Sequence, residues 1–232
     1  MSEVYSWLAM KGASADEACG KLGLTRSGEE CDYFESVFSG AALPTGWYVA
    51  VAGREAFDFF MDFSLERLSE SHDLMVMEVE EHVMQFKLDY WRNGACLWRV
   101  LHDGQQGVYH LEGEGELPAD FEALKAEYVK QLDEAGGENA HVDYLCEVPL
   151  ELARRVTGFG YNMRAADGEE EPVFEELDVS DDYEEIVALQ GAADFEEDET
   201  QPPAPPEQDP QAGAEPREPG RLERWLQKLC GL

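Results

Sequence analysis

The residues of this sequence best suited to acid–base or metal chemistry are five histidines, namely His72, His82, His102, His110 and His141. None has the spacing of an HExxH motif, or of an HxE motif followed by CxxC, so no pair is expected to share a metal ion. His102 precedes Asp103 and could place an imidazole beside a carboxylate in a loop. However, Asp103 followed by Gly104 is typical of a simple turn, and His82 and His110 fall in predicted strands, where a structural role is commoner.

Cys96 is a candidate nucleophile, with His102 or His110 as its base. It lies in the apolar segment ACLWRV, where a buried thiol behaves as a small hydrophobic side chain, so a structural role is expected. The five cysteines of the chain are scattered and contain no CxxC pair. That usage is typical of a reducing compartment and argues against a structural zinc site.

Phosphate and calcium sites are not predicted either. The glycines of GEGEL and GKLGL lack the Lys-Ser/Thr ending of a phosphate-binding loop, and the acidic clusters lack the residue order of an EF-hand. The sequence therefore predicts no catalytic residue, no cofactor site and no metal site.

Charge is the dominant property of the composition. The sequence has 51 acidic and 17 basic residues, which gives a formal net charge of −34. Such a chain repels nucleic-acid phosphates and anionic membranes, so neither is an expected partner. Two interpretations remain open: a generally acidic surface that serves solubility, or an acidic face that attracts and selects a basic protein.

Several elements are predicted in the first third of the chain. Ser14 and Glu17 form a capping-box pattern at the start of a short helix. Residues 33–40 and 46–53 are rich in aromatic and β-branched residues, which favours two strands. Residues 55–69 carry an approximately helical apolar stripe and predict a second helix.

Residues 74–115 give the clearest strand signal. Four segments bounded by turn residues predict an antiparallel meander with strands at 74–81, 82–94, 95–104 and 106–115. Asn93-Gly94 is a strong hairpin signal between the second and third strands. Helices are predicted at 117–137 and 148–158. The order of these elements favours an α+β domain in which an antiparallel sheet is covered on one face by helices.

The composition divides the chain into three parts. Residues 1–190 are predicted to form the acidic α+β domain. Residues 191–220 are dominated by proline, acid and glutamine and predict a disordered linker. Residues 221–232 predict an amphipathic helix whose apolar stripe consists of Leu222, Trp225, Leu226 and Leu229. So short a helix is marginal alone in water, and we expect it to dock on another surface.

Two sets of side chains are predicted to contact a basic partner. The meander would supply exposed aromatic residues and carboxylates, namely Glu80, Glu81, Asp89, Tyr90, Trp91, Glu112 and Glu114. The four apolar residues of the terminal helix would form a second contact, and the linker would raise their effective concentration at the partner.

The N-terminal segment lacks the basic start and the apolar run of a secretory signal peptide. No window approaches the roughly 18 apolar residues that a membrane-spanning helix requires. The sequence therefore predicts a cytoplasmic protein without stable membrane insertion.

A resemblance to uncharacterised acidic bacterial proteins is carried by the runs EEHVMQFKLDYWRNGACLWRVLHDGQQGVYHLEGEGELP, DYLCEVPLELARRVTGF, GASADEACGKLGL and LPTGWYVAVAG. It covers about the first 160 to 180 residues and implies no particular activity. In size and charge the chain is also similar to immunity proteins, which neutralise toxins delivered between bacteria. This second resemblance implies a non-catalytic inhibitor of a basic toxin or effector domain. The alternative is a regulatory or adaptor domain whose terminal helix docks on a partner or on its own body.

Overall fold

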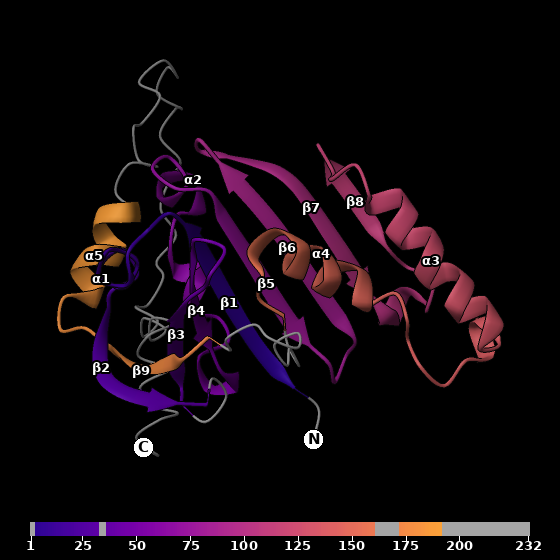
Figure 1. The fold of residues 1–232 in the computed structure, drawn as a ribbon, viewed down its shortest axis with the longest axis horizontal. Helices are drawn as coiled ribbons and strands as arrows, with labels where there is room; N and C mark the ends of the chain where they lie inside the picture. Colours follow the sequence, from indigo (N-terminus) through magenta and orange to yellow (C-terminus); the bar gives the residue numbers. More distant parts are fainter. Residues whose placement is uncertain (1–2, 33–35, 161–171, 192–232) are drawn as a thin grey trace, which may run out of the picture.

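The computed structural model describes residues 3–32, 36–160 and 172–191. They form a nine-stranded sheet in the order β2-β9-β3-β4-β1-β5-β6-β7-β8, and its neighbouring strands are antiparallel (Figure 1). The strands are β1 (Val4–Lys11), β2 (Leu24–Cys31), β3 (Phe38–Ala42), β4 (Trp47–Ala52), β5 (Leu74–Glu80), β6 (Gln85–Arg92), β7 (Ala95–Asp103), β8 (Glu112–Gly115) and β9 (Phe174–Val179). An α+β fold built on an antiparallel sheet is therefore confirmed.

The middle of the sheet contains β1, a strand that the sequence analysis did not predict. Tyr5 and Trp7 belong to the apolar cluster on one face of the sheet, and Leu8 and Met10 belong to the cluster on the other face. A strand that is buried on both faces shows no alternation of apolar and polar residues. The period-2 signal that identified the meander is therefore missing here.

Helices cover both faces of the sheet, rather than the single face that was expected. They are α1 (Ala15–Lys21), η1 (Arg54–Ala56), η2 (Phe59–Asp62), α2 (Leu65–Leu68), η3 (Gly104–Gln106), α3 (Phe121–Glu134), η4 (Gly137–Asn139), α4 (Glu147–Thr157) and α5 (Tyr183–Gly191). α3 and α4 pack on the face that carries Trp7 and Leu88, whereas α1, α2 and α5 pack on the face that carries Leu8. Figure 1 shows α4 across β5 and β6, and α1 with α5 near β2.

Several local predictions are confirmed at the level of single residues. Ser14 caps α1, because its hydroxyl accepts a hydrogen bond from the backbone N–H of Glu17 at 3.2 Å. Asn93 and Gly94 have φ angles of 51° and 76°, the left-handed backbone that a two-residue hairpin requires. α4 ends at Gly158, which has φ 81°.

The helix predicted at 55–69 is wrong as a continuous element. The structure has two short 3-10 turns, η1 and η2, followed by the single turn of α2. Phe63 is extended at φ −98° and ψ 144°, and Ser64 then caps α2. Phe59 and Phe63 both contact the ring of Tyr183, with centroids 5.2 and 5.9 Å away. The apolar stripe therefore reports a buried aromatic cluster and not a helix, because packing outweighs local propensity.

Two strands of the meander are shorter than predicted. β6 begins only at Gln85, because Met84 has a positive φ of 56° in the turn before it. The segment 106–115 contributes strand only at 112–115. His82 and His110 therefore lie outside the strands in which they were predicted.

The sheet also contains a strand from much later in the sequence. β9 pairs with both β2 and β3, so residues 174–179 belong to the same sheet as the N-terminal strands. The predicted terminal helix at 221–232, and all but the first residue of the predicted linker at 191–220, lie outside the described residues. Among the described helices, none has the length and apolar character that crossing a membrane requires.

Gly40 in β3 marks a position where the chain tolerates no side chain. A β-carbon there would overlap the Tyr48 hydroxyl oxygen and lie 2.9 Å from Leu177 Cδ1. We expect Gly40→Ala to lower the free energy of unfolding by about 1–3 kcal/mol, as overpacking does. Urea denaturation measures this loss, and Tyr48→Phe in the same chain should recover part of it by removing the hydroxyl.

Gly20→Ala is the matched control for Gly40→Ala. Nothing lies within 4 Å of a β-carbon at Gly20, which is inside α1. We expect this variant to be neutral or more stable by up to about 1 kcal/mol, because Ala favours helix over Gly. Equal destabilisation by the two substitutions would contradict the steric explanation.

Candidate functional site

One face of β5 to β8 carries mainly charged side chains. On the same side of the sheet, the other strands carry the apolar cluster around Leu8. Residues directly opposite one another in an antiparallel sheet lie on the same face, so the register sets its members. We call the charged face the open face, and it consists of Glu78, Glu80, Gln85, Lys87, Asp89, Arg99, Leu101, Asp103, Glu112 and Glu114. None of these side chains belongs to either apolar cluster. The opposite face of the same strands contributes Leu88 and Val100 to the core.

A line of ion pairs crosses the open face. Lys87 Nζ lies 2.7 Å from Glu78 Oε1 and 3.8 Å from Asp89 Oδ2. Arg99 donates two hydrogen bonds to Asp89, each 2.6 Å long, in a bidentate arrangement. The Asp89 side chain is only 4% exposed, whereas that of Arg99 is 38% exposed. Lys87 and Arg99 are thus already neutralised by carboxylates of the same face.

Two groups at this line of ion pairs, Arg99 and Cys96, have shifted pKa values. The hydrogen bonds that Arg99 donates to Asp89 raise the pKa of Arg99 above its usual range, so the guanidinium stays charged. Cys96, next to the line on β7, is exposed and not buried as expected. Partial burial of its thiol, followed by the Asp89 carboxylate, raises its pKa. Cys96 is therefore a weak nucleophile.

The remaining carboxylates of the open face form no close ion pair with arginine or lysine among the described residues, although Glu114 lies opposite Arg99 and interacts with it electrostatically. Glu80 Oε2 lies 3.7 Å from His82, and Glu112 Oε1 lies 3.3 Å from His110. The Glu112 side chain is 60% exposed, and Glu114 is also exposed. Asp103 accepts a hydrogen bond from Gln106, which lowers its pKa and keeps it ionised. The open face is therefore acidic.

Tyr90 and Trp91 were predicted to be exposed aromatic contacts, which is wrong for Tyr90, and the predicted contact carboxylate Asp89 is buried. Asp89 and Tyr90 are 3% and 8% exposed, and Tyr90 lies on the opposite face, stacked on Trp98 at 5.4 Å. The Tyr90 hydroxyl donates to Asp73, and burial raises the pKa of Tyr90 to about 12. Trp91 is half-buried against the apolar cluster around Leu8. At this end of the strand, apolar clusters occupy both faces of the sheet.

Three predicted carboxylates do share one surface, because Glu80, Glu112 and Glu114 all belong to the open face. Glu81 does not, since it follows β5 in a turn and accepts a hydrogen bond from the backbone N–H of Glu3 at 2.7 Å. The predicted contacts of the terminal helix lie outside the described residues: Leu222, Trp225, Leu226 and Leu229.

His102 has a carboxylate partner, but the partner is Asp143 and not the adjacent Asp103. The ring is completely buried, with Nε2 2.9 Å from Asp143 Oδ2 and Nδ1 2.6 Å from the carbonyl oxygen of His110. A general base must reach the proton that it removes, and this ring is enclosed. The structure gives it no access to a substrate through the described residues.

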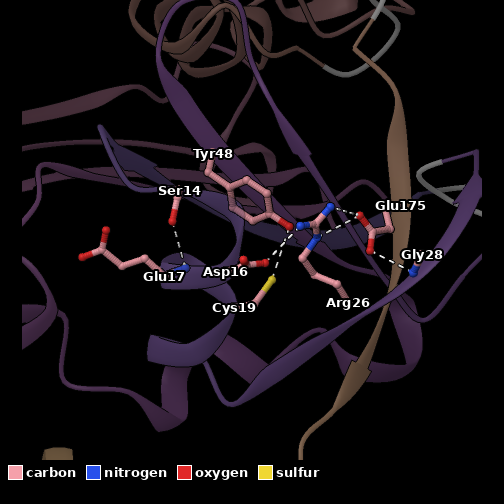
Figure 2. Close-up of polar contacts among 8 residues, drawn as sticks. All are labelled: Ser14, Asp16, Glu17, Cys19, Arg26, Gly28, Tyr48 and Glu175. Atoms are coloured by element: carbon pink, nitrogen blue, oxygen red, sulfur yellow. Dashed lines mark hydrogen bonds and ion pairs between the residues drawn. The ribbon is translucent and has the colours of Figure 1, made fainter.

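A second polar cluster joins α1, β2 and β9, as Figure 2 shows. Arg26 donates to Glu175 at 2.7 and 2.9 Å and to Asp16 at 3.0 Å, and Glu175 also accepts from the backbone N–H of Gly28. The hydrogen bonds from Arg26 lower the pKa of Glu175 and keep it ionised. This cluster fastens the edge strand β2 to its neighbours.

Cys19 and Tyr48 lie beside this cluster, with the sulfur 3.4 Å from the hydroxyl oxygen (Figure 2). Both residues are buried, and burial raises the pKa of the thiol and of the phenol. Neither group can activate the other, because both remain protonated. The pair is a packing contact in the core.

Comparison of the chain with protein-family models, with curated proteins and with solved structures finds no match. In the described ranges, no group of three or more His, Cys, Asp or Glu residues is arranged to hold a metal ion.

The Asp89–Arg99 pair should contribute measurably to stability because one partner is buried. Arg99→Gln leaves the Asp89 carboxylate with Lys87 alone, and we expect a loss of about 1–3 kcal/mol in the free energy of unfolding. Asp89→Asn in the same chain should restore part of the loss, because the buried charge is then gone. Chemical denaturation of the two single variants and the double variant gives the coupling energy.

Arg154→Gln is the control for this cycle. Arg154 forms a bidentate ion pair with Glu151 on the surface of α4. Exposed pairs of this kind contribute up to about 1 kcal/mol, so we expect a smaller effect than at Arg99. A coupling energy near zero for Asp89 and Arg99 would contradict the importance of the buried pair.

Proposed function

We propose that this protein is a non-catalytic binding protein that uses its open face to bind a basic protein. The most specific form of the proposal is an immunity-type inhibitor, which covers a basic toxin or effector domain and thereby neutralises it. The observation that carries the proposal is the excess of carboxylates on a face whose only cations, among its described members, are already paired.

Charge complementarity supports a basic partner. Lys87 and Arg99 are held by Glu78 and Asp89, so the outer carboxylates remain available to lysine and arginine side chains of another molecule. Such complementarity accelerates association and selects against wrong partners. An open antiparallel face is commonly polar, but an even mixture of charges would serve solubility equally well. The imbalance on this face is what favours recognition.

The rigidity of the sheet also supports a binding role. The carboxylates of β8 and β5 are carried on strands that pair with β7, β6 and β1, so their spacing is fixed before a partner arrives. Preorganised groups lose less conformational entropy on binding. Leu101, half-buried between Lys87 and Glu112 in the register, supplies an apolar side chain on the same face.

The state of the reactive side chains favours binding over catalysis. His102 and Cys19 are enclosed in the core, and Cys96 has a raised pKa. Reactive cysteines in enzymes instead have lowered pKa values in partly exposed, positive surroundings.

The test begins with an affinity pull-down from the source cell, using the tagged full-length chain at low and high salt. A retained basic protein is then used in surface plasmon resonance against the variant Glu112→Gln/Glu114→Gln. We expect the association rate at low salt to fall by about threefold to tenfold, because long-range attraction is reduced. The difference should shrink at high salt, where the charges are screened.

The control variant Glu127→Gln/Glu138→Gln removes the same charge from another surface. Both residues are exposed, Glu127 on α3 and Glu138 on η4. We expect the control to bind as the unmodified chain does, apart from a small effect of net charge. Equal association rates for this control and for Glu112→Gln/Glu114→Gln would contradict the proposed role of the open face. A partner that is retained unchanged at high salt would contradict recognition by charge.

A further inference from the structure

His102 connects three separate segments of the chain. It belongs to β7, its Nδ1 contacts the His110 carbonyl oxygen just before β8, and its Nε2 contacts Asp143 in the connection to α4. The ring is completely buried and the Asp143 side chain is nearly so. The ring therefore sits at a junction of the core, away from the open face.

The hydrogen-bond partners determine how many protons the His102 ring carries. A carbonyl oxygen only accepts, so Nδ1 must carry a hydrogen. An ionised carboxylate also only accepts, so Nε2 must carry a second hydrogen. A carboxylic acid is ordinarily a much stronger acid than an imidazolium, so the second proton belongs on the ring. We infer that His102 is an imidazolium paired with the Asp143 carboxylate. The buried proton on Nε2 then holds the segment before α4 against the sheet, and we call this His102–Asp143 ion pair the latch.

The neighbouring titratable groups make His102 the natural place for the charge. The His110 ring lies 6.4 Å away, and its Nδ1 accepts from the Asp103 backbone N–H at 2.9 Å, so this nitrogen acts as an acceptor and carries no hydrogen. His110 Nε2 faces Glu112 at 3.3 Å. From the other side, Phe86 of β6 presents an apolar ring at 6.1 Å. The Cys146 thiol donates to the Asp143 backbone oxygen and carries no charge.

The latch acts on α4 through Asp143. Its Oδ1 accepts from the backbone N–H of Leu145 at 3.1 Å, two residues before the first residue of α4, Glu147. If the Nε2 proton leaves to solvent, a ring lone pair faces the carboxylate oxygen and the attraction becomes repulsion. The segment that includes Leu145 then loses its tie to β7. This device does not depend on the identity of any partner.

The test is nuclear magnetic resonance on the full-length, ¹⁵N-labelled protein across a pH series. Long-range ¹H–¹⁵N spectra at neutral pH should show both ring nitrogens of His102 protonated. When the pH is raised until the Nε2 proton is lost, the hydrogen-exchange protection factor of Leu145 should fall by about tenfold or more, as expected for a charge-assisted hydrogen bond. The protection factor of Leu8, in the middle of the sheet, should stay unchanged and serves as the internal reference.

Asp143→Asn separates the latch from a merely structural contact. An asparagine amide can donate to Nε2 while its oxygen keeps the bond to Leu145, so the fold is satisfied with a neutral ring. We expect His102 to become the neutral Nδ1–H form, with Leu145 protection that no longer changes over the same pH range. An unprotonated Nε2 in the unmodified protein at neutral pH would overturn the inference. Unchanged Leu145 protection after loss of that proton would overturn the latch.

Discussion

The register of the antiparallel sheet is the constraint on which the other features depend. From β1 through β5, β6 and β7 to β8, every pairing places one set of side chains under α3 and α4 and the alternate set on the other face. A shift of one residue in β6 would exchange Asp89 with Tyr90, and so place a carboxylate in the core and a phenol on the open face. The tight turn at Asn93 and Gly94 and the ion pair between Asp89 and Arg99 both favour the observed register.

Much of the fold could be predicted from the sequence where the signal is local. The cap at Ser14, the hairpin at Asn93-Gly94 and the end of α4 at Gly158 depend on a few adjacent residues, and all three are observed. β1 was missed because both of its faces are buried, which removes the alternation that identifies a strand. The segment 55–69 was misread because its phenylalanines pack around Tyr183, a residue more than a hundred positions away.

The open face could be predicted only in part. The sequence indicated acidic residues on the meander, and Glu80, Glu112 and Glu114 do lie together. It could not indicate which face the helices cover, so Tyr90 was assigned to the surface when it lies in the core. Likewise, Asp103 was the only carboxylate adjacent to His102 in the sequence, whereas the observed partner Asp143 comes from the connection before α4. Such pairs depend on tertiary structure and leave no local pattern.

The position of β9 has a consequence for the order in which the chain can assemble during synthesis. β2 has no partner strand in the described sheet except β9, which the ribosome makes more than 140 residues later. β1 and the strands from β3 to β8 can pair with one another well before that point, because their contacts are nearer in sequence. The pairing of β2 must therefore come later, because β9, which also carries the Glu175 partner of Arg26, has not yet been synthesised. β2 is thus synthesised early but paired late, and until β9 is made its unpaired backbone groups are open to other chains.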